Sequence, residues 1–341
     1  MQVPRLTRSA WLSLGLGVLI SAIGVWLVAR DLDPAQLGRA LSTADYSWAL
    51  IGVVAVGATF FVRTRRWAAL LQPIPYRSST IMAALLVGQM LNTLLPLRAG
   101  DVTRALVLGR APGSSVERVL GSVAVEKALD WLSLTALVLI VALVAPLPEW
   151  FVAPAHTFGI VAVFLLVSLG LIASQRARGL RLIDRLLAGI PARWRLAVLE
   201  RLGRLVDGME SLRRREIIWR AGAWSALTWL LGIAANAAVM RAFGVDAWPA
   251  AMFLMAVLMV GVALPPSIAA LGVFEALAVL ALGAFGVPRE TALAIGVTLH
   301  GVAFVPPVVC GSLLAVWETR AGRLLPGRSA AIPDAAPPRG L

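Results

Sequence analysis

The chain has 341 residues, of which 59% are hydrophobic and only 14% are charged. Its mean hydropathy is +0.84, whereas soluble domains carry about 25% charged residues. This composition excludes a soluble globular domain and a disordered chain. The formal net charge is +13, and Lys127 is the only lysine among the 31 basic residues. In a membrane protein such an arginine excess marks cytoplasmic loops, so we expect no nucleic-acid partner.

Six apolar stretches are long enough for a helix to cross the hydrocarbon core, which takes about 20 residues. They are residues 10–29, 46–62, 119–145, 157–173, 217–240 and 291–317. We interpret the first as an uncleaved signal anchor rather than a signal peptide, because no small-residue cleavage site precedes Arg30. Two more apolar regions, 79–110 and 249–286, are interrupted in the middle. The sequence therefore predicts an all-α polytopic membrane protein with about six full spans and two broken hairpins.

Arginine positions predict the orientation, because the cytoplasmic flanks of short loops retain positive charge. With the N-terminus inside, 26 of the 30 arginines lie in inner segments and four lie in outer loops. The inner set includes Arg63, Arg65 and Arg66, which follow the span 46–62. The count balances only if residues 79–110 enter and leave on the cytoplasmic side as a re-entrant hairpin. We thus expect both termini in the cytoplasm.

A polar stretch, residues 174–216, divides the transmembrane domain 1–320 into a first half, 1–173, and a second half, 217–320. Apolar residues recur in it at helical spacing between arginines. This pattern predicts a basic, cytoplasmic, amphipathic connector lying in the plane of the inner leaflet, and a solvated linker is the alternative. Residues 321–341 are rich in proline, alanine and glycine, which predicts a disordered cytoplasmic tail.

The two broken regions share a local pattern of a Leu-Pro bend, small residues, a glycine and then an acid. The first reads Leu95-Pro96, Gly100, Asp101, and the second reads Leu264-Pro265, Gly272, Glu275. Under the predicted topology the two hairpins enter from opposite sides, as in inverted repeats whose discontinuous helices meet at a substrate site. Irregular backbone at membrane depth is tolerated where it is buried or lines a wet cavity. Simple proline kinks are the alternative.

Ionisable and polar side chains gather in the same regions, where an unpaired charge costs about 3 kcal/mol or more. The candidate headgroup-binding residues are Asn92, Arg98, Asp101, Arg104, Glu126, Lys127, Asp130 and Glu275. Glu126 and Asp130 share one helix face at i and i+4. We expect either a salt-bridge network that locks helices together or a polar cavity in which arginine holds a lipid phosphate. His300 is a candidate proton relay, with a structural hydrogen bond as the alternative.

The run from Asn92 to Arg104 (NTLLPLRAGDVTR) resembles the signature of a flippase-like family that includes the transmembrane region of lysylphosphatidylglycerol synthase, N-x-x-x-P-x-R-x-G-E-x-x-R. Two later blocks also resemble that family. They comprise Ser122, Glu126, Lys127 and Asp130, and then Pro265, Pro266, Gly272 and Glu275. The similarity covers residues 10–320. Asp101 and Lys127 stand where the family has Glu and Arg, so both charges are kept.

The resemblance implies a multi-pass protein of a bacterial-type plasma membrane that moves lipids between leaflets, without the soluble synthase domain. We expect an anionic phospholipid or a polyprenyl phosphate as the lipid, and neither cofactor nor metal. No G-x-x-x-x-G-K-[ST] motif occurs, so movement would be passive, ion-coupled or driven by a partner. The alternatives are a membrane-embedded lipid-phosphate enzyme and a scaffold that recruits a lipid-modifying or glycosyltransferase partner through the basic connector.

Overall fold

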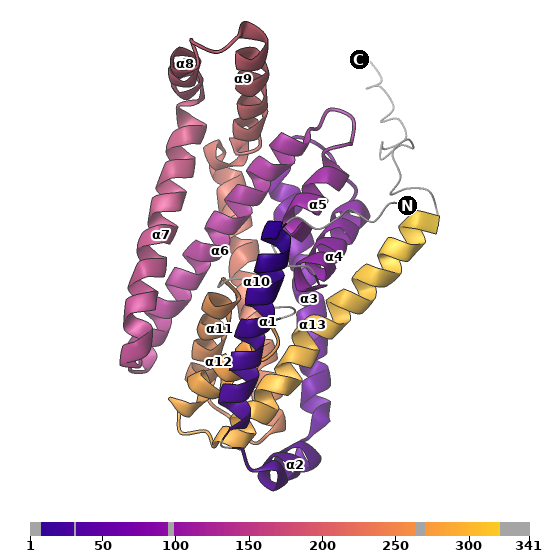
Figure 1. Ribbon diagram of the computed structural model, residues 1–341, viewed down its shortest axis with the longest axis vertical. Helices are drawn as coiled ribbons and strands as arrows, with labels where there is room; N and C mark the ends of the chain where they lie inside the picture. Colours follow the sequence, from indigo (N-terminus) through magenta and orange to yellow (C-terminus); the bar gives the residue numbers. More distant parts are fainter. Residues whose placement is uncertain (1–7, 31, 95–98, 264–269, 321–341) are drawn as a thin grey trace, which may run out of the picture.

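The computed structural model describes residues 8–30, 32–94, 99–263 and 270–320, and every regular element in these ranges is helical. Figure 1 shows the helices as an elongated bundle. The helices are α1 (Arg8–Ala29), α2 (Pro34–Thr43), α3 (Tyr46–Leu70), α4 (Ser78–Leu94), α5 (Ala99–Leu108), α6 (Val116–Val144), α7 (Glu149–Ser174), α8 (Arg176–Leu186), α9 (Ala192–Asp207), η2 (Glu210–Arg213), α10 (Arg215–Ala242), α11 (Trp248–Ala263), α12 (Val273–Gly283) and α13 (Arg289–Arg320).

Within the described ranges, five helices are long and apolar enough to cross a membrane: α3, α6, α7, α10 and α13. They match five of the six expected crossings. At the sixth, α1 forms a helix of 22 residues. Two expected boundaries were wrong. The helix α7 begins at Glu149 rather than at residue 157, and α3 continues to Leu70, beyond residue 62, because Arg63 and Arg66 find acidic partners inside the bundle. The multi-pass helical prediction is confirmed.

Each broken region forms two short helices that pack together, α4 with α5 and α11 with α12. Figure 1 shows α4 and α5 in the upper half of the bundle and α11 and α12 in the lower half. The bends themselves, 95–98 with Arg98 and 264–269, lie outside the described residues, as does the predicted tail 321–341. The helices α4 and α5 meet at two glycines, where a Cβ on Gly100 would lie 1.8 Å from the Gly88 carbonyl oxygen. Only glycine permits this approach.

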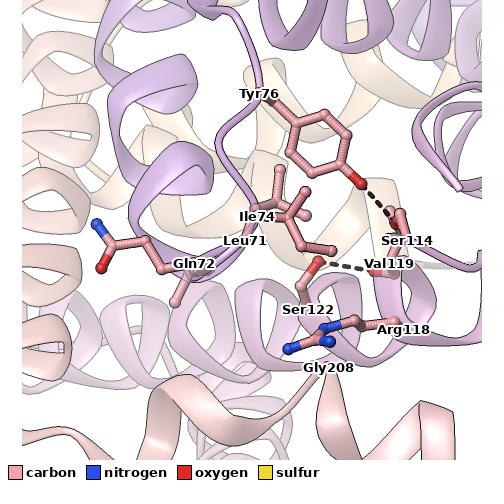
Figure 2. A pocket seen from close by; sticks show the side chains of 10 residues that line it. Leu71, Gln72, Ile74, Tyr76, Ser114, Arg118, Val119, Ser122 and Gly208 are labelled. Carbon is pink, nitrogen blue, oxygen red and sulfur yellow. Dashed lines mark hydrogen bonds between the residues drawn. The ribbon is translucent and has the colours of Figure 1, made fainter. Parts of the chain in front are cut away.

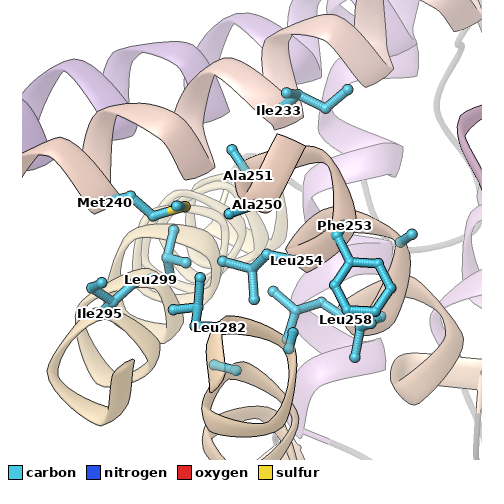
Figure 3. Packing of buried hydrophobic residues seen from close by; sticks show 14 of the residues in the cluster. Ile233, Met240, Ala250, Ala251, Phe253, Leu254, Leu258, Leu282, Ile295 and Leu299 are labelled. Atoms are coloured by element: carbon cyan, nitrogen blue, oxygen red, sulfur yellow. The ribbon is translucent and has the colours of Figure 1, made fainter. Parts of the chain in front are cut away.

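Buried apolar side chains form two cores, one above the other along the bundle. The upper core combines α3, α4 and α5 with residues 119–129 of α6 and residues 217–221 of α10. The lower core combines α11, α12 and α13 with residues 134–141 of α6 and residues 233–240 of α10, and Figure 3 shows its interdigitated side chains. Both α6 and α10 therefore run through the two cores. Polar side chains gather near the junction.

The connector forms a helical hairpin, since α8 packs on α9. Figure 1 shows this hairpin above α7, standing beyond the end of the bundle along its long axis. The connector is thus two packed helices, of which α9 docks on α6, and its position in the plane of the inner leaflet stays a prediction. A Cβ on Gly208 would lie 1.9 Å from the Arg118 carbonyl oxygen, and Arg204 forms an ion pair with Glu117 at 3.3 Å. The described start of α1 and the end of α13 lie toward this same end of the molecule. Which end faces the cytoplasm stays a prediction.

Candidate functional site

Glu126 is the centre of a buried ion cluster. It is fully buried, and both of its carboxylate oxygens are engaged. Arg66 Nη2 donates to Glu126 Oε1 at 3.0 Å, and Arg104 Nη1 donates to Glu126 Oε2 at 2.6 Å. Both arginines are themselves buried. One carboxylate of α6 thus holds a guanidinium from α3 and another from α5, which compensates part of the desolvation cost of all three charges.

Asp130 lies one helical turn after Glu126 and shares Arg66 with it. Arg66 Nη1 donates to Asp130 Oδ1 at 2.6 Å and to Ser225 Oγ of α10 at 3.2 Å. The prediction that Glu126 and Asp130 share a helix face is confirmed by this common partner. A single arginine therefore joins α3, α6 and α10.

Asp101 connects the α4–α5 hairpin to the cluster. Its Oδ1 lies 3.1 Å from Arg104 Nη2, and its Oδ2 lies 3.4 Å from Lys127 Nζ. The side-chain nitrogen of Asn92 donates to Asp101 Oδ1 at 3.4 Å, while Asn92 Oδ1 accepts from the backbone N–H of Gly100 at 2.8 Å. Asn92 thus fixes α4 to the start of α5, and Asp101 bridges two cations.

One side of the cluster is open and cationic. The side chains of Arg63 and Lys127 are 23% and 35% exposed, and Arg63 Nη2 lies 3.9 Å from Glu126 Oε1. Four cations, Arg63, Arg66, Arg104 and Lys127, face three carboxylates, Asp101, Glu126 and Asp130. The described part of the cluster therefore carries one excess positive charge.

Arg104 and Arg66 also have unused hydrogen-bond donors. Arg104 Nε, Arg104 Nη2 and Arg66 Nε are buried without a hydrogen-bond partner, although the charge of Asp101 lies close to Arg104 Nη2. The Arg104 guanidinium lies over the Trp67 ring at 4.7 Å, and Trp67 Nε1 donates to Ser122 Oγ at 3.1 Å. Buried polar groups nearly always find partners. Unused guanidinium donors in a cluster with excess positive charge suit an anionic ligand.

Glu275 lies in a separate group. Its Oε2 accepts from the backbone N–H of Gly272 at 2.8 Å, which caps the start of α12, and its Oε1 lies 2.6 Å from His300 Nδ1 on α13. His300 is also packed between Phe274 and Phe304, with ring centroids at 5.0 and 4.5 Å. Within the described residues Glu275 makes no ion pair with the Glu126 cluster. The structure thus gives His300 a hydrogen-bonding partner, while its proton-relay role stays a prediction.

Of the predicted site residues, the structure brings together Asn92, Asp101, Arg104, Glu126, Lys127 and Asp130. Arg98 lies outside the described residues. Sequence reasoning missed Arg63, Arg66 and Ser225. Arg63 and Arg66 were assigned to an inner loop, and this was wrong for Arg66, which is fully buried in α3. The sequence did contain a signal: Arg63 and Arg66 are three residues apart, a spacing that places them on one face of a helix that continues to Trp67.

Two hollows lie away from the cluster. Figure 2 shows the smaller, lined by Tyr76, Ser114 and Ser122, with a volume of about 10 Å³, which is room for about one water molecule. Burial raises the pKa of the Tyr76 phenol, which therefore stays protonated and donates to Ser114 Oγ. The larger is an open apolar groove of about 540 Å³ between the α6–α7 loop and α12. Neither hollow is lined by Arg66, Arg104 or Glu126.

Comparison with known proteins agrees with the sequence motifs. The family described as "Lysylphosphatidylglycerol synthase TM region" matches residues 14–311. A curated relative, "Glycosyltransferase AglD" from Haloferax volcanii, is 27% identical over 136 residues, and that match covers 39% of this chain and 22% of the relative. No solved structure matches significantly. The resemblance predicted from the motifs is confirmed: the chain belongs to the family of the lysylphosphatidylglycerol synthase transmembrane region.

Proposed function

We propose that the protein binds the phosphate of an anionic lipid at the open face of the Glu126 cluster and moves that lipid between leaflets. The observation that carries this proposal is the set of unused donors on Arg104 and Arg66 beside the partly exposed cations Arg63 and Lys127. A guanidinium presents parallel N–H groups that match two phosphate oxygens, and such charge-assisted hydrogen bonds are about twice as strong as neutral ones.

Asp101 supplies the means of release. It holds Arg104 and Lys127 and is itself partly exposed, so an arriving phosphate competes with its carboxylate for the same two cations. When the phosphate leaves, Asp101 neutralises the cations again. Arg104 and Lys127 therefore have an anionic partner both in the phosphate-bound state and in the empty state. This keeps the difference in free energy between the two states small enough for repeated transport.

The two packed helix pairs suit a transport cycle. In this proposal α4 with α5 and α11 with α12 are re-entrant hairpins from opposite membrane faces, related as inverted repeats. Their places in opposite halves of the bundle support this arrangement. The Glu275–His300 contact joins α12 to α13, and in this proposal it is the candidate site of ion coupling.

Neutralising Arg63 tests the headgroup site. Arg63→Gln is expected to slow lipid translocation about 10-fold or more, because a charge-assisted hydrogen bond contributes about 1.5–3 kcal/mol. Arg63 makes one long ion contact at 3.9 Å and lies over the Phe60 ring at 5.6 Å, much as the control Arg65 lies over Phe61, so the fold should tolerate the loss of its charge. The assay follows fluorescent phosphatidylglycerol, phosphatidylcholine and a polyprenyl phosphate in liposomes that contain the purified protein.

Arg65→Gln is the matched control, since Arg65 is on the same helix but exposed and lies over Phe61 at 5.3 Å. Its rate should equal that of the wild type. Equal rates for Arg63→Gln and wild type, or no translocation of any of the three lipids by the wild type, would refute the proposal.

A second candidate is an action on a polyprenyl-linked lipid that carries a sugar, and the one observation in favour of a sugar is that the AglD relative is named a glycosyltransferase. The polyprenyl phosphate arm of the same assay addresses this substrate class. Phosphate release from that lipid, lost in Asp101→Asn, would instead identify a lipid-phosphate enzyme.

A further inference from the structure

The α8–α9 hairpin is a separately braced unit. Near its tip Arg195 Nε lies 3.2 Å from Asp184 Oδ1, and near its base Arg176 Nε lies 2.8 Å from Asp207 Oδ1. Gly208 and the Arg204–Glu117 ion pair then fix the base of α9 to α6. These contacts give the hairpin a defined place against α6, which a solvated linker would not require.

Large apolar side chains are exposed on the outer half of this hairpin. Leu186 is 75% exposed, and Trp194 is 59% exposed. The exposed apolar set, which we call the tip surface, comprises Leu182, Leu186, Ile190, Trp194, Leu196 and Val198. Six exposed large apolar side chains on one short hairpin are more than scattered solvent contact requires, and they indicate an interaction site.

The height of the tip surface argues against lipid as its cover. The exposed apolar side chains of α7 continue up to Ile172, and Leu186 follows 14 residues later on a helix that stands above α7 in Figure 1. If α8 continued the axis of α7, a rise of 1.5 Å per residue would make this separation about 21 Å, which is its upper limit because Gln175 interrupts the two helices. The headgroup layer extends only about 5–8 Å beyond the hydrocarbon core. The upright position of the hairpin therefore favours a protein rather than acyl chains as the cover of the tip surface.

The charge of the α8–α9 hairpin indicates which kind of partner would bind the tip surface. Residues 176–207 include eight arginines and three acids, and each of the three acids already contacts an arginine. Among the described residues, Arg178, Arg181, Arg185, Arg193 and Arg201 have no acidic partner within 4.0 Å. A second copy would bring the same positive charge and be repelled. We propose that the tip surface docks a protein partner that presents an apolar groove rimmed by acidic residues.

Site-specific photo-cross-linking of the full-length protein in its native cells tests this proposal. A photo-reactive amino acid at position 186 or 194 is expected to give a discrete protein adduct, and the control position 143, an exposed apolar site on α6, should not give it. The double variant Arg181→Glu/Arg185→Glu should abolish the adduct. The captured protein, once purified, should bind the full-length chain in nanodiscs of neutral lipid, and binding should weaken at least 10-fold in the double variant.

Trp194→Ala provides a second variant that removes an apolar anchor and leaves the charge unchanged, and it should also weaken binding. Thermal unfolding of each variant checks that the fold is kept. Adducts only with lipid, adducts only with another copy of the chain, no adduct at either position, or binding that is insensitive to both variants would each overturn the proposal. The lipid-translocation assay is independent of these outcomes, because the tip surface lies apart from the Glu126 cluster.

Discussion

Glu126→Gln is expected to destabilise the folded protein by about 3–5 kcal/mol, the largest effect of any conservative substitution in the cluster. The glutamine keeps the size of the side chain but removes the charge that neutralises Arg66 and Arg104. Two buried guanidinium groups would then share Asp130 and Asp101, which are both partly exposed and screened. Thermal unfolding in detergent, followed by tryptophan fluorescence, measures the loss.

Glu117→Gln is the control for that experiment. Glu117 lies on the same helix and also binds an arginine, but its side chain and that of Arg204 are 27% and 34% exposed. Exposed ion pairs contribute about 0–1 kcal/mol, so this variant should unfold close to the wild-type temperature. If the two variants unfold at the same temperature, the Glu126 cluster does not stabilise the fold as described.

Gly100→Ala is expected to cost about 3 kcal/mol of stability and to abolish translocation. The new Cβ would lie 1.8 Å from the Gly88 carbonyl oxygen and 2.7 Å from Asn92 Oδ1. The Gly88 carbonyl belongs to the backbone of α4 and cannot move without separating α4 from α5, and overpacking of this kind costs about 1–3 kcal/mol or more. The separation would also pull Asp101 away from Arg104 and Lys127. Unfolding and liposome assays of one preparation measure both effects.

Gly57→Ala is the matched control, because a Cβ at Gly57 on α3 meets nothing within 4 Å. Alanine favours a helix by up to about 1 kcal/mol over glycine, so this variant should be as stable as the wild type or slightly more stable. A Gly100→Ala protein with wild-type stability and transport would show that α4 and α5 need not touch.

The α6 acids show what could be predicted from sequence. Spacing of four residues on a helix places Glu126 and Asp130 on one face regardless of tertiary structure, and a buried face with two acids requires a cation. The identity of that cation was not predictable in the same way. Arg66 is 60 residues from Glu126, and counting arginines by loop placed it outside the membrane. Its burial depends on how α3 packs against α6 and α10, which local sequence does not encode.

Glu275 shows the opposite case. The patterns Gly100-Asp101 and Gly272 to Glu275 look alike in sequence, but their acidic side chains make different contacts. Asp101 directly follows Gly100 and faces neighbouring cations, whereas Glu275 lies three residues after Gly272 and reaches back to its backbone N–H. A spacing of three between the residue that precedes a helix and a Glu is that of a capping box, which could have indicated the local role. The contact with His300 spans 25 residues and depends on packing.

The two stacked cores have an electrostatic consequence. A single apolar core would present a headgroup with one uninterrupted low-dielectric barrier about 30 Å thick. Here ionic side chains on α3, α5 and α6 lie where the upper core gives way to the lower core. In the proposed transport, this ionic layer would divide the barrier into two shorter ones, and a phosphate would meet compensating charge at the inner end of each. Because α6 and α10 run through both cores, the same pair of helices would border both barriers.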